Sequence, residues 1–261
     1  MRDKEVLTRQ YKDSSNLYIR RNFHKKYGTN STGYADWIIS KIKFFQGCRV
    51  LEVGCGTGSL WENYPQLIDT FSELVLTDIF KGMIDIVKDS YGGRKNVKIQ
   101  VMDILDVPFE ANSFDIIVAN SMLYHVNDVD PALENIHRIL RDDGVFHATT
   151  FGKDVLINYI NNAMFEMGLS DSKKIGEISF SLENGSDILR NHFSVVKEEI
   201  YDTHLEVSEP VDLVEYIFSM ASMSHIDKSN REKMNAYFES KKDRQGILTI
   251  PQMYGMFISS Y

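Results

Sequence analysis

The stretch Val50-Leu51-Glu52-Val53-Gly54-Cys55-Gly56-Thr57-Gly58-Ser59-Leu60 joins an apolar run to three glycines at alternate positions. The apolar part, residues 48–53, has the length and composition of a buried β-strand. Glycine is needed where a backbone turns sharply or where a ligand approaches the main chain closely. A helix that begins behind the glycines would offer free N–H groups and a partial positive charge. The stretch therefore predicts a strand, a glycine loop and a helix, and the loop is either a structural turn or a ligand site.

Short apolar runs and helix-length segments alternate over the next 90 residues. Further strands are expected at residues 74–78, 97–101, 114–119 and 145–150. Helices are expected between them, at about residues 58–66, 80–91 and 131–141. Strands that alternate with helices predict an α/β fold with a parallel sheet covered on both faces.

The flanking regions have a different pattern. Residues 1–46 predict two helices, and Ala35, Ile38, Ile39 and Ile42 form an apolar stripe on the second. Beyond residue 150, helices are expected at 154–167 and from Pro210, a strand at 193–196, and a strand pair at 247–250 and 253–258. No linker is evident, so we expect one domain, 1–261: a helical cap (1–46), a core (47–152) and a remainder (153–261) with a helical insertion at about 207–246.

Composition limits the classes of partner. The 261 residues include 29 Lys and Arg against 37 Asp and Glu, a net charge of −8, which argues against a nucleic-acid partner. No apolar stretch is long enough to cross a membrane, and the charged start is unlike a signal peptide. Cys48 and Cys55 do not form a Cys-x-x-Cys pair, and the histidines lack ligand spacing, so no metal site is predicted. A cytoplasmic protein without a membrane partner is expected.

Two acidic residues indicate which ligand the glycine loop would bind. Asp78 ends the second expected strand, where its carboxylate can accept hydrogen bonds from both hydroxyls of a ribose. A dinucleotide fingerprint would place its third small residue at the position of Ser59, whereas here the glycine comes one residue early. Asp103 follows the third strand, where it can meet an adenine amino group. The pattern favours another adenosine cofactor over a dinucleotide.

These motifs resemble those of the class I S-adenosylmethionine-dependent methyltransferases. The resemblance covers about residues 46–152 and includes Pro108-Phe109, Ser113-Phe114-Asp115, the segment 120–126 and the segment 139–144. It is closest to small-molecule methyltransferases such as the quinone-biosynthesis C-methyltransferases. It implies a Rossmann-like sheet of seven strands, mostly parallel with an antiparallel last strand. It also implies S-adenosylmethionine as cofactor and S-adenosylhomocysteine as product.

The resemblance implies a binding role for each motif. The loop residues would line the methionine and ribose portion, with Glu52 behind them near the amino group, and Asp78 would bind the ribose hydroxyls. Ile79 and Met83 would lie beside the adenosine, the turn after the third strand would hold adenine, and the exit of the fourth strand would receive the methionine ammonium. The remaining residues of these groups are Gly54, Cys55, Gly56, Thr57 and Gly58 in the loop, Met102, Asp103 and Ile104 in the turn, and Asn120 and Ser121 at the exit.

Methyl transfer is an in-line displacement, so the protein has to align donor and acceptor. A base is needed only when the acceptor is protonated in its ground state. His125, just past the fourth strand, is the first candidate for that base, with packing or hydrogen bonding at the cofactor edge as the other interpretation. Tyr124 either lines the acceptor site or belongs to the core.

The N-terminal aromatic residues suggest a lid over the acceptor or, alternatively, the buried face of the extension itself; they are Tyr11, Tyr18, Tyr27 and Trp37. The fourth strand exits as Asn120-Ser121-Met122-Leu123, not as the Asn/Asp-Pro-Pro-Tyr that adenine-N6 methyltransferases carry. The sequence thus favours methylation of a small molecule. A protein or RNA acceptor and a non-catalytic cofactor-binding module stay open, as does the choice between monomer and homodimer.

Overall fold

The computed structural model describes residues 15–152, 156–171 and 178–261. The chain forms two compact units, each assembled from three segments. The first comprises Met1–Gly33, Gly152–Glu177 and Asp202–Met253, and the second comprises Tyr34–Phe151, Ile178–Tyr201 and Tyr254–Tyr261. Because the chain crosses repeatedly from one unit to the other, no single linker marks the boundary in the sequence. Tyr11, one of the expected lid residues, lies outside the described residues.

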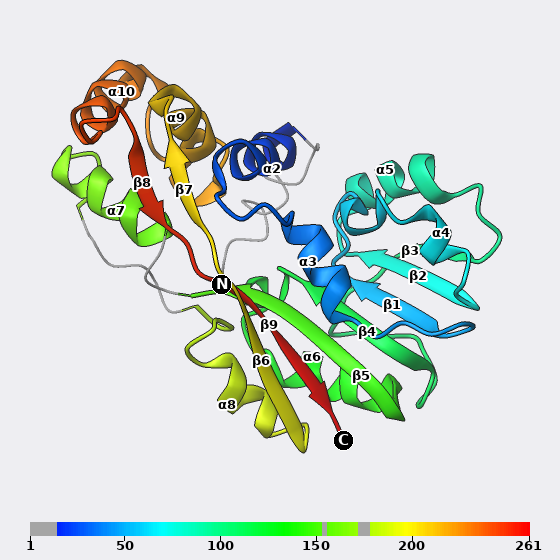
Figure 1. Ribbon diagram of the computed structural model, residues 1–261. Helices are drawn as coiled ribbons and strands as arrows, with labels where there is room; N and C mark the ends of the chain where they lie inside the picture. The colour runs from blue at the N-terminus through cyan, green and yellow to red at the C-terminus, as the bar shows by residue number, and fades with distance from the viewer. Residues whose placement is uncertain (1–14, 153–155, 172–177) are drawn as a thin grey trace. The chain divides into compact units, whose positions relative to one another are not determined.

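The second unit contains the expected sheet (Figure 1), with strand order β3-β2-β1-β4-β5-β9-β6. The pairs among β1 to β5 are parallel, and β9 is antiparallel to both β5 and β6. The predicted seven-stranded, mostly parallel sheet is therefore confirmed. Its strands are β1 Arg49–Val53, β2 Glu73–Asp78, β3 Val97–Val101, β4 Phe114–Asn120, β5 Leu140–Phe151, β6 Val195–Tyr201 and β9 Tyr254–Ser260.

Helices cover both faces of this sheet. One apolar core lies beneath α6 and α8, and another lies beneath α3, α4 and α5 (Figure 1). Burial of both faces explains why β1, β2 and β4 read as nearly continuous apolar runs. These helices are α3 Tyr34–Lys41, α4 Pro65–Ile68, α5 Lys81–Tyr91, α6 Asp130–Ile139 and α8 Gly185–Arg190.

The helix predicted at residues 58–66 is wrong. A 3₁₀ turn, η1 (Ser59–Trp61), follows the glycine loop, and the short α4 begins separately at Pro65. Proline disfavours helical geometry in the residue before it, and Tyr64 accordingly has φ −124° and ψ 42°. Trp61 is fully buried in the core beneath α3. We infer that the packing of this side chain, rather than helix propensity, determines the backbone conformation of the segment.

The first unit has its own apolar core and a two-stranded sheet. Its core contains Phe23, Ile160, Leu205, Leu213 and Phe238, all at most 3% exposed. The antiparallel sheet consists of β7 (His204–Val207) and β8 (Leu248–Pro251). Its helical elements are α2 Ser15–Tyr27, α7 Leu156–Glu166, α9 Pro210–Phe218, α10 Arg231–Ser240 and the 3₁₀ turns η3 Ala221–Met223 and η4 Lys228–Asn230.

The strand pair predicted near the C-terminus is also wrong. Strands form at both positions, but β8 pairs with β7 in the first unit, whereas β9 pairs with β5 and β6 in the second. Apolar alternation shows that a segment is a strand without showing its partner. The helices expected within 1–46 divide in the same way, since α2 belongs to the first unit and α3 to the second.

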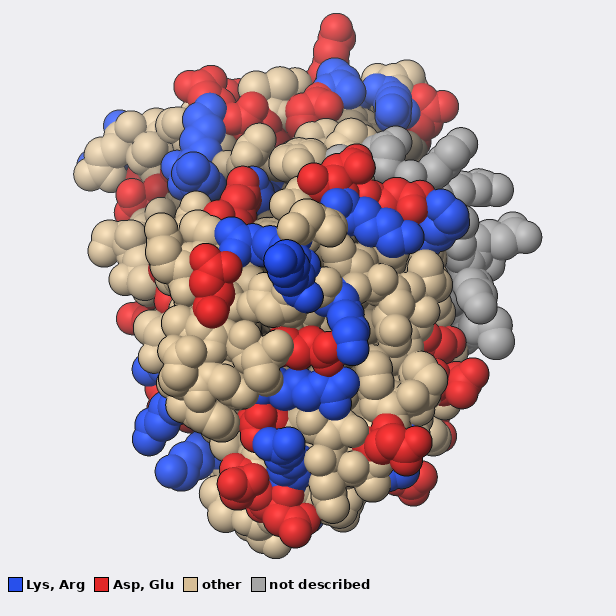
Figure 2. All heavy atoms as spheres, turned by 90° about the vertical axis from the view of Figure 1, so that its right-hand side faces the viewer, with Lys and Arg blue, Asp and Glu red and all other residues tan. Residues whose placement is uncertain are grey.

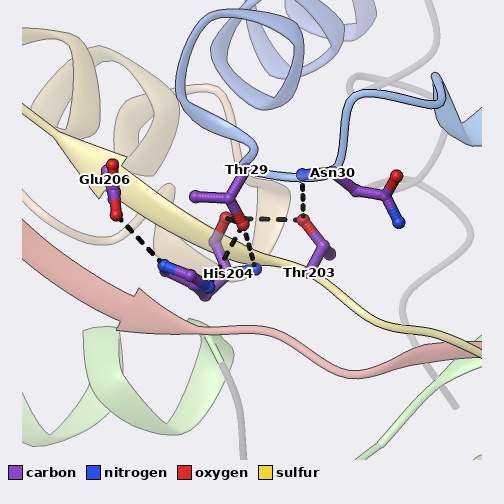
Figure 3. A network of polar contacts seen from close by, with 5 residues as sticks. All are labelled: Thr29, Asn30, Thr203, His204 and Glu206. Carbon is purple, nitrogen blue, oxygen red and sulfur yellow. Dashed lines mark hydrogen bonds and ion pairs between the residues drawn. The ribbon is translucent and has the colours of Figure 1, made fainter.

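In the first unit, a polar network joins the residues after α2 to β7 (Figure 3). Thr29 and His204 exchange hydrogen bonds, with Thr29 N donating to His204 O at 3.0 Å and His204 N donating to Thr29 Oγ1 at 3.1 Å. Asn30 N donates to Thr203 Oγ1, and Glu206 lies 3.3 Å from His204 Nε2. These contacts hold the end of α2 beside the small sheet.

On the face shown in Figure 2, basic and acidic side chains are interspersed. Ion pairs within the second unit follow the same pattern, as in Arg94–Asp69 and Lys98–Glu73. None of the helices in the described part of the chain is long and apolar enough to span a membrane.

Candidate cofactor site

The glycine loop after β1 has a backbone that only glycine adopts readily. Gly54, Gly56 and Gly58 have φ angles of 65°, 55° and 74°, all in the left-handed region. A Cβ atom on Gly54 would lie 2.8 Å from the Met122 side chain, and one on Gly58 would lie 2.8 Å from the Tyr91 ring. A Cβ atom on Gly56 would meet no atom within 4 Å. Packing therefore requires the outer two glycines, while the middle one leaves main chain open to a ligand.

Asp78, at the end of β2, is tied to this loop. Its Oδ2 accepts a hydrogen bond from the Gly56 N–H at 2.9 Å, and its Oδ1 accepts one from the Phe80 N–H at 2.8 Å. Burial raises the pKa of the carboxyl, whereas these backbone donors lower it. Each carboxylate oxygen can accept a second hydrogen bond, so the group is held in place with capacity left for a pair of hydroxyls.

Glu52, on β1, lies behind the loop and is 1% exposed. Its Oε2 accepts a hydrogen bond from Trp61 Nε1 at 2.7 Å. Burial raises its pKa to about 8, and the nearby Asp78 acts in the same direction. The carboxyl group is therefore mostly protonated at neutral pH without ligand, and a cation placed next to it would favour its ionised form.

The turn after β3 is arranged around Asp103. Its Oδ1 accepts a hydrogen bond from the Leu105 N–H at 3.0 Å. Met102 and Ile104 are buried on either side of it. Of the residues predicted beside the adenosine, Ile79 is 39% exposed while Met83 is fully buried on α5, so Ile79 has the surface for direct contact.

Where β4 ends, Ser121 has a positive φ of 53°, a strained value for a residue with a side chain. Its N–H donates to Thr149 Oγ1 at 2.8 Å, and Thr149 Oγ1 donates to Asn120 Oδ1 at 2.8 Å. The hydroxyl of Thr149, on β5, thus fixes the exit of β4. Asn120 and Ser121 both remain half-buried at the carboxyl edge of the sheet, on the strand adjacent to β1.

The two residues predicted to act on the acceptor lie in the next turn, η2 (Leu123–His125). The Tyr124 and His125 rings are 4.4 Å apart between centroids, and Tyr124 contacts the Phe151 ring at 4.8 Å. Tyr124 also packs against the core beneath α6. Both side chains are half-buried, and their roles stay predictions.

Three residues that support the loop and the β4 exit were not anticipated from sequence. Trp61 donates to Glu52, Tyr91 Oη donates to Gly58 O at 2.8 Å, and Thr149 bonds to both Asn120 and Ser121. Tyr91 and Thr149 are far in sequence from their partners, so no local pattern marks them, and Trp61 is nine residues from Glu52. Among the described residues, no three His, Cys, Asp or Glu side chains gather in a way that could hold a metal ion.

The family described as a methyltransferase domain matches residues 51–148. The matched range runs from β1 into β5 and contains the glycine loop, both acids and the β4 exit. Residues 51–148 are a class I S-adenosylmethionine-dependent methyltransferase domain.

The methyltransferase domain is shared with curated relatives. It is 32% identical over 113 residues to the ubiquinone/menaquinone biosynthesis C-methyltransferase UbiE of Idiomarina loihiensis, which covers 42% of this chain and 45% of that protein. It is 34% identical to the mitochondrial arginine-hydroxylase NDUFAF5 of Mus musculus over 110 residues, and this match covers 41% of this chain and 29% of that protein. The chain thus spans less than half the length of either relative.

Solved structures resemble more of the chain. The YcgJ protein of Bacillus subtilis superposes with a TM-score of 0.60 at 16% identity, over 87% of this chain and 98% of that one. The CMeT domain of the citrinin polyketide synthase superposes with a TM-score of 0.53 at 17% identity, over 87% of this chain and 52% of that one. At these identities the likeness shows the fold around the methyltransferase domain.

Proposed function

We propose that this chain is an enzyme that transfers a methyl group from S-adenosylmethionine to a small-molecule acceptor. The observation that carries the proposal is the bond between the Asp78 carboxylate and the Gly56 N–H, made where the main chain is open to a ligand. An anchored carboxylate beside an open glycine loop suits a ribose whose substituents approach the backbone closely.

Each portion of the cofactor would be bound by residues at the end of a different strand. Asp103, Met102 and Ile104 after β3 would hold adenine, Asp78 after β2 the ribose, and the loop after β1 the sulfonium. Asn120 and Ser121 after β4 would receive the methionine ammonium. The bound cofactor supplies an electrophilic methyl group on sulfur, and these residues bind and orient it at the sheet edge.

Several observations support a small molecule as the acceptor. The net charge is −8, and the face in Figure 2 mixes acidic with basic side chains, whereas nucleic-acid binding needs clustered cations. The β4 exit lacks the Asn/Asp-Pro-Pro-Tyr sequence. The UbiE protein is named a ubiquinone/menaquinone biosynthesis C-methyltransferase. A Staphylococcus aureus relative, 26% identical over 143 residues (55% of this chain and 59% of that protein), is named a demethylmenaquinone methyltransferase. A cytoplasmic location and a monomer or homodimer remain part of the proposal.

His125 is the candidate base within this proposal. It lies one turn past β4, at the carboxyl edge where ligands bind in open α/β sheets. Its imidazole would take the proton of a phenol or enol as the methyl group arrives, and Tyr124 would line the acceptor side. For an acceptor that carries no such proton, His125 would act in binding only.

The proposal is tested by calorimetry followed by product analysis. We expect the purified protein to bind S-adenosylmethionine and S-adenosylhomocysteine, and Asp78→Ala to lose that binding. Incubation with panels of phenols, quinols, protein and RNA should then add 14 Da to a small molecule. Because one relative is named a hydroxylase, the mass gain is decisive: a gain of 16 Da, or methylation confined to protein or RNA, would overturn the proposal. Tight binding without any product would favour the non-catalytic module.

A further inference from the structure

Tyr34 is the first residue of α3, and its ring is held by three other aromatic side chains. It stacks on Trp37 at 5.8 Å with an interplanar angle of 12°. Its centroid lies 5.2 Å from that of Tyr201 on β6 and 5.3 Å from that of Tyr254 on β9. All four residues belong to the second unit, so contacts from one helix and two strands determine where the Tyr34 hydroxyl points.

The hydroxyl points to the end of β4 and β5. Desolvation raises the pKa of this hydroxyl to about 12, and hydrogen-bonding interactions with the Thr149 and Ser121 side chains lower it by a smaller amount. The group therefore stays protonated at neutral pH and can donate. Its oxygen is buried, yet it makes no hydrogen bond of normal length and angle to any residue that the structure describes. A buried hydroxyl without a partner is rare in folded proteins and calls for an explanation.

The neighbouring polar groups already bond to one another. The Ser121 N–H donates to Thr149 Oγ1, and the Thr149 hydroxyl donates to Asn120 Oδ1. The Ser121 hydroxyl lies 3.4 Å from Asn120 Oδ1 and 3.3 Å from Thr149 Oγ1. The Tyr34 hydroxyl is thus an additional donor at the carboxyl edge of the sheet, where β4 ends at the strained Ser121.

The order of the strands indicates which part of the ligand lies near this donor. In the proposed function, adenine, ribose and sulfonium follow the sheet from β3 through β2 to β1, so the amino-acid end lies over β4. The Tyr34 hydroxyl is at the β4–β5 side of this row. That end of the cofactor carries an ammonium and a carboxylate on one carbon, and only the carboxylate accepts a hydrogen bond.

We propose that the Tyr34 hydroxyl donates a hydrogen bond to the carboxylate of the methionine portion of the cofactor. The inference rests on the proposed function and extends its site to α3, which lies outside the matched range of residues 51–148. Tyr34 then couples α3, through its aromatic contacts, to cofactor binding.

The test compares two ligands by calorimetry on the full chain. S-adenosylhomocysteine carries the amino-acid portion, whereas 5′-methylthioadenosine lacks it. Tyr34→Phe keeps the ring and its packing and removes only the hydroxyl. Tyr64→Phe is the matched control, because its hydroxyl bonds to Asp36 on α3 at 2.7 Å, outside the proposed site.

Because the lost hydrogen bond is to a charged group, we expect Tyr34→Phe to weaken the binding of S-adenosylhomocysteine about 10-fold to 100-fold. Binding of 5′-methylthioadenosine should stay unchanged, and Tyr64→Phe should leave both affinities unchanged. Equal weakening of both ligands, or none, would overturn the inference, since the hydroxyl would then not contact the carboxylate. If the unmodified protein binds neither ligand, the proposed function fails first.

Discussion

The carboxylate of Asp78 and the main-chain N–H of Gly56 are joined by a hydrogen bond of 2.9 Å. They belong to different strand ends, and this bond fixes the geometry of the glycine loop at the edge of the sheet. The same carboxylate accepts the Phe80 N–H at 2.8 Å, so one side chain holds the loop after β1 and the start of α5 together.

Replacement of Asp78 should therefore affect both binding and stability. Asp78→Ala removes the charged acceptor of two N–H groups, and a hydrogen bond to a charged group contributes about 1.5–3 kcal/mol. We expect a lower free energy of unfolding in urea and at least about tenfold weaker S-adenosylhomocysteine binding. Asp78→Asn retains one oxygen acceptor and should be closer to the parent in stability. Parent-like affinity in Asp78→Ala would contradict the assigned role.

Gly56 should differ from the other left-handed glycines in what its replacement disturbs. Gly56→Ala and Gly47→Ala introduce the same kind of backbone strain, since φ is 55° and 81° and neither Cβ meets an atom within 4 Å. Each should cost about 1–2 kcal/mol of stability. Only Gly56→Ala should also weaken S-adenosylhomocysteine in calorimetry, because its methyl group enters the space left for the ligand. Equal affinities in the two variants would show that Gly56 does not face it.

Glu52 should make stability and binding depend on pH. Its pKa of about 8 lies above the ordinary value of 4.5, so it contributes stability that is lost as pH rises from about 4.5 through 8. The effect is on the order of a few kcal/mol. In Glu52→Gln, the free energy of unfolding measured in urea should change less with pH over this range than it does in the parent.

Calorimetry provides a second check on Glu52. If the ligand ammonium lies near this carboxyl group, S-adenosylhomocysteine binding near pH 7 should release a proton, because a nearby cation favours the ionised form. The observed binding enthalpy would then vary with the ionisation enthalpy of the buffer in the parent but not in Glu52→Gln. Buffer-independent enthalpy in the parent would count against the assignment.

His147, on β5, should make stability depend on pH in the opposite sense to Glu52. It is 2% exposed, its Nδ1 has no partner among the described residues, and burial lowers its pKa to about 4. The folded protein resists its protonation, so stability should fall as pH decreases from 6.5 to about 4, by up to about 3 kcal/mol. His147→Leu should lose less stability than the parent between pH 7 and pH 5. An identical loss in both would remove His147 as a cause.

His125→Asn separates catalysis from binding. Once an acceptor is found, we expect turnover to fall by about 10²–10⁴-fold if His125 is the base, with S-adenosylhomocysteine affinity nearly unchanged. Rates measured from pH 5 to 9 should lose their dependence on an imidazole group in the variant. Unchanged turnover would limit His125 to packing against Tyr124, which its ring already contacts.

Much of the second unit was predictable because its strands are buried on both faces. Residues 48–53 and 114–119 are short apolar runs, and β1 and β4 form there within one residue. The helix expected at 80–91 forms as α5, since its apolar stripe packs onto the sheet. The helix expected at 58–66 does not form, because Pro65 and the burial of Trp61 override local preference.

The amino-acid sequence by itself determined where β1 to β5 lie along the chain, the glycine loop and the two acids after β2 and β3, because glycine, alternation and strand ends are local properties of the chain. Only the tertiary structure decided which segments became partners. It separated β8 from β9, divided residues 1–46 between two units, and brought Trp61, Tyr91 and Thr149 to the site. It also aimed the Tyr34 hydroxyl at Ser121 and Thr149. Such contacts depend on packing between distant segments, for which no local pattern exists.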